Sequence, residues 1–412
     1  MCKKLLITNG RILTMAGKVL PKGCVLTENG RITAVADQIE IPEDKDTEII
    51  DASGCLVMPG LIEAHCHVGI TEEKKGMEGD DCNENVSPVT PWLRALDAIN
   101  TMDAAFDDAV RAGITSIMAG PGSSNVVGGQ FVFLKTKGRR IDDLIVKEPA
   151  AMKIAFGENP KVNFMDQQKS PVTRMAIAGL LREELFKARE YQKKKQAWQK
   201  KNQGKSPSSP DSPFEPDFRM EPWLPVLEGK IPLKAHVHRA DDIFTAIRIA
   251  KEFGLSMTLD HCSEGHLIAE ELAKEGFPAI VGPDLSSRSK IEVQNMAFKT
   301  AAVLHQAGVL VAITTDHPVT LIQSLPLCAG LAVKSGLPME EGLRAITCNP
   351  ARICRVYDRV GSLEPGKDAD IAIFTGNPME TFTKTMCTII NGTIAYRDEN
   401  FYPQALNSPI PK

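Results

Sequence analysis

The sequence lacks long apolar runs, paired cysteines and an excess of basic charge. No stretch of about 18 consecutive apolar residues occurs, so we expect no membrane-spanning helix. The 10 cysteines stand singly, without a Cys-x-x-Cys pair, in a chain of 412 residues, which favours reduced thiols over a disulfide framework. Against 48 lysines and arginines stand 52 acidic residues, and this net charge of −4 argues against a nucleic-acid-binding protein. Aromatic residues make up only 5%, which argues against extensive stacking of bases or sugars.

What is present is typical of a globular protein. Hydrophobic residues form 43% of the chain and charged residues 24%, so a sizeable core is expected and global disorder is excluded. The N-terminal sequence reaches Asn9-Gly10 too soon for the apolar region of a signal peptide. Together with the unpaired cysteines, this predicts a cytoplasmic protein.

The two ends of the chain share one pattern. Short β-branched and apolar runs are separated by turn signals such as Asn9-Gly10, Ser53-Gly54 and Asn391-Gly392. We therefore predict one small β-sandwich domain that both ends build together, from residues 1–58 and 356–412.

The middle of the chain, residues 59–355, alternates short apolar strands with helical stretches, several of which end in glycine. Such alternation predicts a parallel sheet, and this many units predict an α/β fold of the (β/α)8 TIM-barrel type. The expected strands are residues 113–120, 151–157, 233–238, 256–261, 278–283 and 309–317.

A basic segment interrupts the barrel pattern at about residues 182–225. Nine lysines and arginines between Arg182 and Lys205 precede a Ser- and Pro-rich stretch. We interpret it as a surface helix that runs into a flexible loop inserted between barrel units. Such basic runs are usually solvated faces.

Histidines mark the ends of the expected strands. His65 and His67 lie two residues apart and therefore share one face of a strand, which suits a divalent metal, above all zinc. His236, His238, His261 and Asp316 stand at the ends of three later strands. Because the ligands of (β/α)8 enzymes gather at the carboxyl ends of strands, this distribution predicts a metal site.

The segment Pro59-Gly60-Leu61-Ile62-Glu63-Ala64-His65-Cys66-His67, followed in order by His236, His261 and Asp316, resembles the amidohydrolase superfamily, near its imidazolonepropionase-like members. The resemblance covers nearly the whole chain, including the β-rich ends. It implies a divalent metal, either one ion or two, held by His65, His67, His236, His261 and Asp316.

The residues also predict a reaction. A metal held by neutral imidazoles and a carboxylate lowers the pKa of a bound water to roughly 7, which supplies hydroxide at neutral pH. We expect this hydroxide to attack the substrate carbon. Asp316 would take the proton of the water and deliver it to the leaving nitrogen.

Two ligand assignments stay open at this point. His236 and His238 share a face, and the resemblance favours His236 as the ligand, which leaves His238 to orient the substrate. On the strand at residues 151–157, some relatives carry a carboxylated lysine and others a glutamate. Lys153 and Glu158 face opposite ways on a regular strand. We prefer Glu158 because it stands nearer the mouth of the barrel.

Clues to the substrate are mixed. Gly128-Gly129-Gln130 is expected in a loop over the barrel mouth, where Gln130 could contact a substrate. Arg239 and Arg288 could each clamp a carboxylate. The segment from Glu72 to Glu84 carries six acidic residues, which favours a cationic or polar substrate instead.

We therefore expect a metal-dependent hydrolase of a non-peptide C–N bond in a cyclic or linear amide or an N-acyl compound. A dipeptidase or N-deacetylase on the same scaffold is the second interpretation, and an inactive oligomeric scaffold is the third. The expected partner is a small-molecule substrate, with neither nucleic acid nor membrane involved. We also expect a homo-oligomer.

Overall fold

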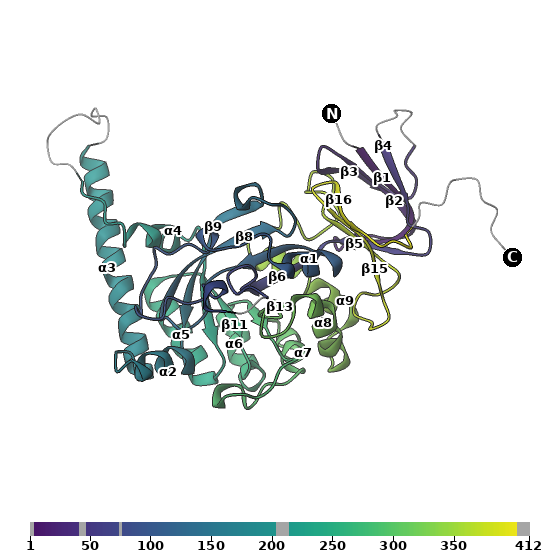
Figure 1. Cartoon of the computed structure of the whole chain (residues 1–412). Helices are drawn as coiled ribbons and strands as arrows, with labels where there is room; N and C mark the ends of the chain where they lie inside the picture. Colours follow the sequence, from purple (N-terminus) through teal and green to yellow (C-terminus); the bar gives the residue numbers. More distant parts are fainter. Residues whose placement is uncertain (1–3, 41–46, 74–75, 203–213, 402–412) are drawn as a thin grey trace.

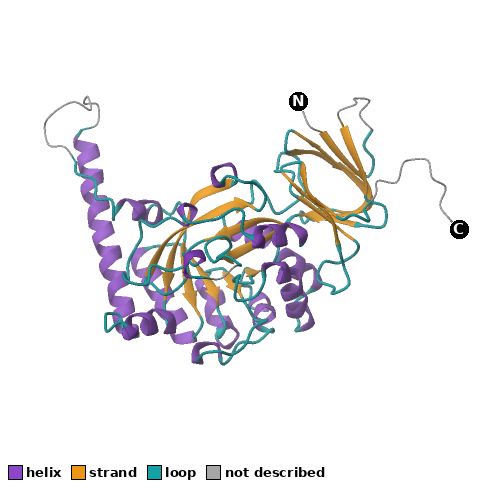
Figure 2. Cartoon of the chain, in the orientation of Figure 1, coloured by secondary structure: helices purple, strands orange, loops and turns teal. Residues whose placement is uncertain are grey.

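The computed structural model of the chain describes residues 4–40, 47–73, 76–202 and 214–401. Within these residues the strands form two separate eight-stranded sheets (Figures 1 and 2). Sheet B lies among the helices, and sheet A forms a second, smaller unit beside it.

Sheet B forms the barrel, and its strands follow one another in chain order from β6 to β13. One face of these strands packs against the surrounding helices in a large apolar cluster that includes Met152, Leu233 and Leu259. The strands are β6 (Leu61–Cys66), β7 (Ile114–Ala119), β8 (Val127–Lys135), β9 (Ile145–Ala155), β10 (Leu233–Val237), β11 (Met257–His261), β12 (Ala279–Val281) and β13 (Val311–Ile313).

Polar contacts join the first barrel strand to the segment that follows the last one. The buried carboxylate of Glu63 accepts hydrogen bonds from the N–H and the hydroxyl of Thr315, at 2.8 and 2.7 Å. The hydroxyl of Thr314 donates to the carbonyl of His65 at 2.6 Å. These bonds nearly close the eight-stranded sheet, and the predicted barrel is confirmed.

One strand departs from the expected pattern. Residues Gly128, Gly129 and Gln130 belong to strand β8 rather than to a loop, and β8 runs antiparallel to both β7 and β9. The connection from β7 to β8 is too short for a helix, so the chain turns back directly. Glycine is required at Gly129, where φ is +128° and a Cβ atom would lie 2.5 Å from the carbonyl oxygen of Leu93.

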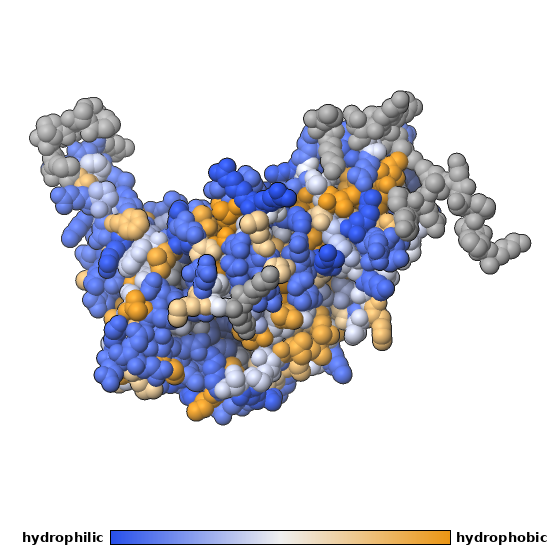
Figure 3. All heavy atoms as spheres, viewed as in Figure 1, coloured by the Kyte–Doolittle hydropathy of each residue, from blue (hydrophilic) through white to orange (hydrophobic). Residues whose placement is uncertain are grey.

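The helices surround sheet B, and the longest of them opens the basic segment. Helix α3 begins at Arg174, earlier than the predicted insert, and buries Ile177, Leu181 and Leu185 against the barrel. Its far end projects beyond the barrel and is mostly hydrophilic (Figures 1 and 3). The loop expected after it lies largely outside the described residues. The helices are α1 (Ala104–Arg111), α2 (Glu158–Asp166), α3 (Arg174–Lys201), α4 (Leu224–Leu227), α5 (Ala240–Phe253), α6 (Ala269–Glu275), α7 (Thr300–Gln306), α8 (Leu325–Lys334), α9 (Met339–Arg344) and α10 (Cys348–Ile353).

Both ends of the chain contribute to sheet A, where the purple N-terminal and yellow C-terminal strands lie side by side in Figure 1. The junction is the antiparallel pairing of β5 with β14. Sheet A is one continuous hydrogen-bonded sheet that curves around its own apolar core. Its strands are β1 (Lys4–Leu13), β2 (Val19–Glu28), β3 (Arg31–Ala36), β4 (Thr47–Asp51), β5 (Leu56–Pro59), β14 (Ile371–Phe374), β15 (Thr385–Ile390) and β16 (Thr393–Arg397).

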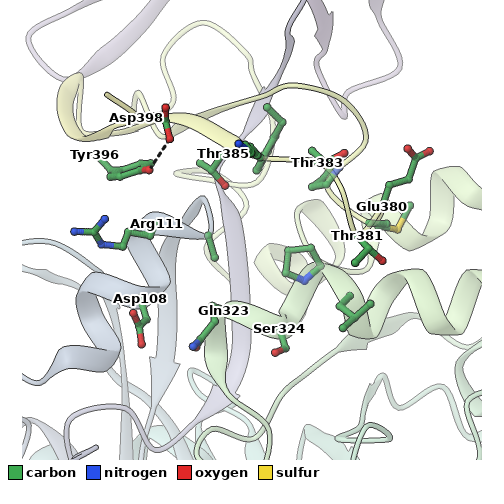
Figure 4. A pocket seen from close by; sticks show the side chains of 17 residues that line it. Asp108, Arg111, Gln323, Ser324, Glu380, Thr381, Thr383, Thr385, Tyr396 and Asp398 are labelled. Carbon is green, nitrogen blue, oxygen red and sulfur yellow. Dashed lines mark hydrogen bonds between the residues drawn. The ribbon is translucent and has the colours of Figure 1, made fainter. Parts of the chain in front are cut away.

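A buried ion cluster and a surface hollow lie along the seam between the two sheets. Lys135, at the end of β8, places its ammonium 2.5 Å from Asp370 and 3.0 Å from Asp368. The hollow has a volume of about 530 Å³ (Figure 4). In it the guanidinium of Arg111 lies over the ring of Tyr396. Because Arg111 ends helix α1, this hollow lies at the N-terminal end of the barrel strands.

No helix among the described residues combines the length and the apolar character needed to cross a membrane.

Candidate metal centre

The histidines and the aspartate predicted from strand ends meet in one place. Imidazole pairs from β6, β10 and β11 have ring centroids 4.5 to 5.4 Å apart. Two overlapping groups of donor atoms form, and the atoms in each lie within 4.8 Å of one another: His236, His238 and His261 in the first, and His65, His261 and Asp316 in the second.

Asp316 links the imidazoles of β6. Its Oδ1 lies 3.2 Å from Nε2 of His67 and 3.3 Å from Nε2 of His65, and its Oδ2 lies 4.0 Å from Nδ1 of His261. These side chains are nearly or fully buried. A carboxylate and three imidazoles therefore converge at the carboxyl ends of strands from opposite parts of the chain.

Two of these residues hold a backbone conformation that is rare outside glycine. His261 has φ +72° and Asp316 has φ +50°. Asp260 already contacts His65 from the barrel interior, so regular alternation would turn His261 away. The left-handed turn at His261 brings its imidazole to the same side. Such conformations cost about 1–3 kcal/mol each and cluster at functional sites.

Backbone carbonyls fix the orientation of two imidazoles. Nδ1 of His67 lies 2.7 Å from the carbonyl of Gly120, and Nδ1 of His261 lies 2.8 Å from the carbonyl of Gly282. A carbonyl only accepts hydrogen bonds, so each Nδ1 carries the hydrogen. In a neutral ring, Nε2 then keeps its lone pair for a metal ion.

The electrostatics favour neutral imidazoles at several of these positions. Burial lowers the pKa of His236 and His238 well below the usual value, and the neighbouring imidazoles lower it further. Burial also lowers the pKa of His65 to about 3, with help from the ammonium groups of Lys153 and Lys234. Neutral imidazoles are the form that binds metals.

The donor set fits a divalent cation. Nε2 of His261 and Oδ1 of Asp316 are buried without a hydrogen-bond partner among the described residues. Burial by itself lowers the pKa of His67, but Cys82 and Asp316 outweigh it and raise that pKa to about 10. The cluster therefore attracts positive charge, and its imidazole nitrogens and carboxylate oxygens are ligands that zinc accepts.

Strand β9 brings Lys153 to the cluster, whereas Glu158 was expected there. The fully buried Nζ of Lys153 lies 3.4 Å from Nε2 of His65, and burial lowers the pKa of Lys153 to about 8. Glu158 lies beyond the strand end, where the left-handed Gly157 turns the chain into α2. Neither group of donor atoms includes Glu158. The lysine reaches the cluster because its side chain is long.

His236 and His238 both face the cluster, so the geometry does not separate their roles. Nε2 of His236 lies 3.7 Å and Nε2 of His238 lies 3.8 Å from Oε1 of Glu292. Nδ1 of His238 lies 2.8 Å from the hydroxyl of Ser263, which fixes the ring. His238 comes two residues later than His236 and thus stands nearer the mouth.

The expected substrate contacts have other partners. The side chain of Gln130 donates to the carbonyl of Pro91 at 3.0 Å. The guanidinium of Arg239 forms two bonds with Asp241, and that of Arg288 donates to the carbonyl of Met296. Arg239 and Arg288 thus bond within their own segments, and Gln130 joins β8 to the segment that contains Pro91.

Sequence reasoning missed several polar residues around the cluster. Lys234 and Asp260 are fully buried beneath it, with Nζ and Oδ2 3.1 Å apart. Glu292 and Lys290 come from the segment between β12 and α7. Lys234 precedes His236 by two residues, so strand periodicity could have found it, whereas only folding brings Glu292 near His236.

The comparisons with known proteins agree with this geometry. Residues 228–395 match the family model described as "Amidohydrolase family". A solved structure of an amidohydrolase from Thermotoga maritima MSB8 is 39% identical, with a TM-score of 0.90 over 96% of this chain and 100% of that one. A dihydroorotase from Elusimicrobium minutum is 27% identical over 92% of this chain and 90% of its own length.

Amidohydrolase tasK of Hapsidospora irregularis is 28% identical over 94% of this chain, which spans only 41% of that longer relative. The match to the Thermotoga structure, by contrast, covers the whole length of that protein. The resemblance drawn from the strand-end histidines is thus confirmed. The chain belongs to the amidohydrolase family, and it is a hydrolase of that family.

Proposed function

We propose that the chain is a metal-dependent hydrolase that cleaves a non-peptide C–N bond in a cyclic or linear amide or an N-acyl compound. The observation that carries this proposal is the convergence of His65, His67, His261 and Asp316 around one point, with His236 beside them. All five positions carry side chains that bind metals, which argues against an inactive scaffold. A relative named dihydroorotase, 27% identical over 92% of this chain, supports this reaction class.

The residues that would hold a first divalent cation are His65, His67 and Asp316, and those for a second are His236 and His261. A bound divalent cation supplies Lewis acidity, which makes water a nucleophile near neutral pH and polarises a carbonyl. We assign the role of ligand to His236 because His238 stands nearer the mouth, where a substrate enters.

Asp316 is the proposed general acid and base. Its carboxylate would take a proton from the attacking water and then deliver it to the leaving nitrogen, a role worth about 10²–10⁴-fold in rate. Its Oδ1 lies 3.3 Å from Nε2 of His65 and 3.2 Å from Nε2 of His67, the two nitrogens that would share the first cation with it. His238, fixed by Ser263, would donate a hydrogen bond from Nε2 to the substrate carbonyl.

Lys153 is the proposed ligand from β9, as a carbamate. Its neutral amine nitrogen adds to the carbon of carbon dioxide: an N–C bond forms, one C=O π bond opens to a C–O⁻ group, and one N–H proton is released. The product is a carboxylate on a long side chain, with a charge of −1. The position of Nζ, buried 3.4 Å from His65, supports this assignment over Glu158.

Two measurements on the purified protein test the proposed function. Metal analysis should find one or two equivalents of a divalent ion, and a panel of cyclic amides, linear amides and N-acyl compounds should contain a substrate. Asp316→Asn should then lower kcat by about 10²-fold or more. Full activity in this variant would rule out the proposed proton transfer, and dipeptides as better substrates would favour the dipeptidase interpretation.

A further inference from the structure

The segment between β12 and α7 places one ion pair at the edge of the metal centre. Lys290 and Glu292 come from this segment, and Nζ of Lys290 lies 2.6 Å from Oε1 of Glu292. The same oxygen lies 3.7 Å from Nε2 of His236. The pair therefore stands directly beside the imidazoles of β10.

The two members of this pair differ in exposure. The side chain of Glu292 is only 1% exposed, and its Oε2 accepts a hydrogen bond from the N–H of Glu158 at 2.7 Å. The side chain of Lys290 is 24% exposed. The cation of the pair is thus accessible from solvent, and the anion is not.

Asn159 fixes the ammonium group of Lys290 from the other side. Nζ of Lys290 donates to Oδ1 of Asn159 at 2.7 Å, and Nδ2 of Asn159 donates to the hydroxyl of Ser123 at 2.7 Å. Nδ2 also lies 3.5 Å from Nε2 of His236. Lys290 is thereby tied to the metal centre through both Asn159 and Glu292.

Lysine has three N–H donors, and Lys290 donates one to Asn159 and forms an ion pair with Glu292. No third acceptor contacts it within the described part of the chain. Arg239 and Arg288, the arginines that the sequence suggests for binding a carboxylate, already have partners. Arg239 is bonded to Asp241, and Arg288 donates to the carbonyl of Met296. Lys153 and Lys234 are fully buried and lie out of solvent reach.

We propose that Lys290 is an anchor for an anionic group of the substrate, and that the substrates are N-acyl compounds that carry a carboxylate near the scissile bond. This inference rests on the proposed function and names its substrate class. The third N–H of Lys290 donates to the carboxylate, while Glu292 and Asn159 position the ammonium group. The carboxylate then fixes the acyl carbonyl beside His236 and His238.

Matched substrates and variants test the anchor. An N-acyl amino acid carries a carboxylate, and its C-terminal carboxamide carries a neutral group of the same shape. Wild type should hydrolyse the acid with a kcat/KM about 10- to 100-fold higher, as expected for one charged hydrogen bond. Lys290→Gln should remove this preference through KM, and Lys290→Arg should restore part of it. Lys274→Gln, which removes the same charge from the last turn of α6, should leave the preference unchanged.

The outcomes separate the anchor from the proposed function. An equal loss of activity on both compounds in Lys290→Gln, or no loss on either, would overturn the anchor while the hydrolase stands. If wild type hydrolyses neither compound, the proposed function fails for this class. Calorimetry then measures the affinity of the protein for the N-acyl amino acid and for its carboxamide. If wild type binds the acid more tightly and Lys290→Gln loses this difference, the anchor is supported. If wild type binds both compounds equally, the anchor is refuted.

Discussion

Asp260 Oδ2 lies 2.8 Å from Nδ1 of His65, and both side chains are completely buried. The carboxylate thus holds the imidazole so that its other nitrogen, Nε2, faces Asp316. Outer carboxylates of this kind orient metal-binding histidines and increase their basicity. Asp260 also lies 3.1 Å from the ammonium of Lys234, which supplies its counter-charge.

Asp260→Asn is expected to weaken metal binding by about 10- to 100-fold, because His65 loses its orienting charge. Competition with a chelator measures this change. The substitution also leaves the buried ammonium of Lys234 without its carboxylate partner, so the protein should lose stability. The double variant Asp260→Asn/Lys234→Met removes the unpaired ammonium and should recover stability, measured by thermal unfolding, but not metal affinity. Recovery of both would contradict the orienting role.

The two candidates on β9 differ in their expected effects. Lys153→Met should lower the metal content of the protein, because it removes the side chain that reaches His65. Glu158→Gln should leave the content unchanged, because Glu158 contacts Glu292 through its backbone N–H and not through its carboxylate. Elemental analysis after gel filtration measures both variants. If Glu158→Gln loses metal and Lys153→Met does not, Glu158 is the ligand, as the sequence suggested.

The backbone at Gly157 passes close to the carboxylate of Glu292, where only glycine has room. A Cβ atom at this position would lie 2.5 Å from Oε2 of Glu292, and φ is +84°. Gly157→Ala is therefore expected to cost about 1–3 kcal/mol from steric overlap, in addition to backbone strain. Gly254→Ala is the matched control, since φ is +70° and no atom lies within 4 Å. Urea denaturation that gave equal losses for the two variants would show that the contact with Glu292 is unimportant.

The ion cluster at Lys135 makes stability depend on pH. Burial alone would raise the pKa of Asp368, but Arg359 and Lys135 outweigh burial and hold it below its ordinary value. The folded pKa therefore lies below the unfolded one, so this contribution to the free energy of unfolding is present above about pH 4 and is lost as the pH falls further.

Lys135→Met leaves two carboxylates buried near each other and is expected to cost about 3–5 kcal/mol at neutral pH. The variant should also lose less stability than wild type below about pH 4, because Asp368 then has only Arg359, and no longer Lys135, to lower its pKa. Chemical denaturation at a series of pH values measures both effects. Parallel stability curves for the two proteins would contradict this account.

The sequence by itself predicted the architecture and the histidines and aspartate that meet in the candidate metal centre. Strand–helix alternation predicts the barrel because hydrophobic periodicity is a local property of the chain. The histidines follow, since residues at the carboxyl ends of barrel strands meet at one mouth. His65 and His67 share a face through the two-residue period, and no knowledge of the fold is needed to pair them.

Only the tertiary structure decided which neighbours complete the centre. Glu292 stands 56 positions after His236 in the chain, and no local period relates them; the path of the segment between β12 and α7 brings them together. Strand β8 was not predicted because its glycines are typical of a turn, whereas pairing with β9 places them in a sheet. At Gly129 the missing Cβ leaves room for the carbonyl of Leu93. Lys153 rather than Glu158 lies beside the cluster, because reach depends on side-chain length and on where a strand ends. These are properties of packing in space, and sequence spacing alone does not contain them.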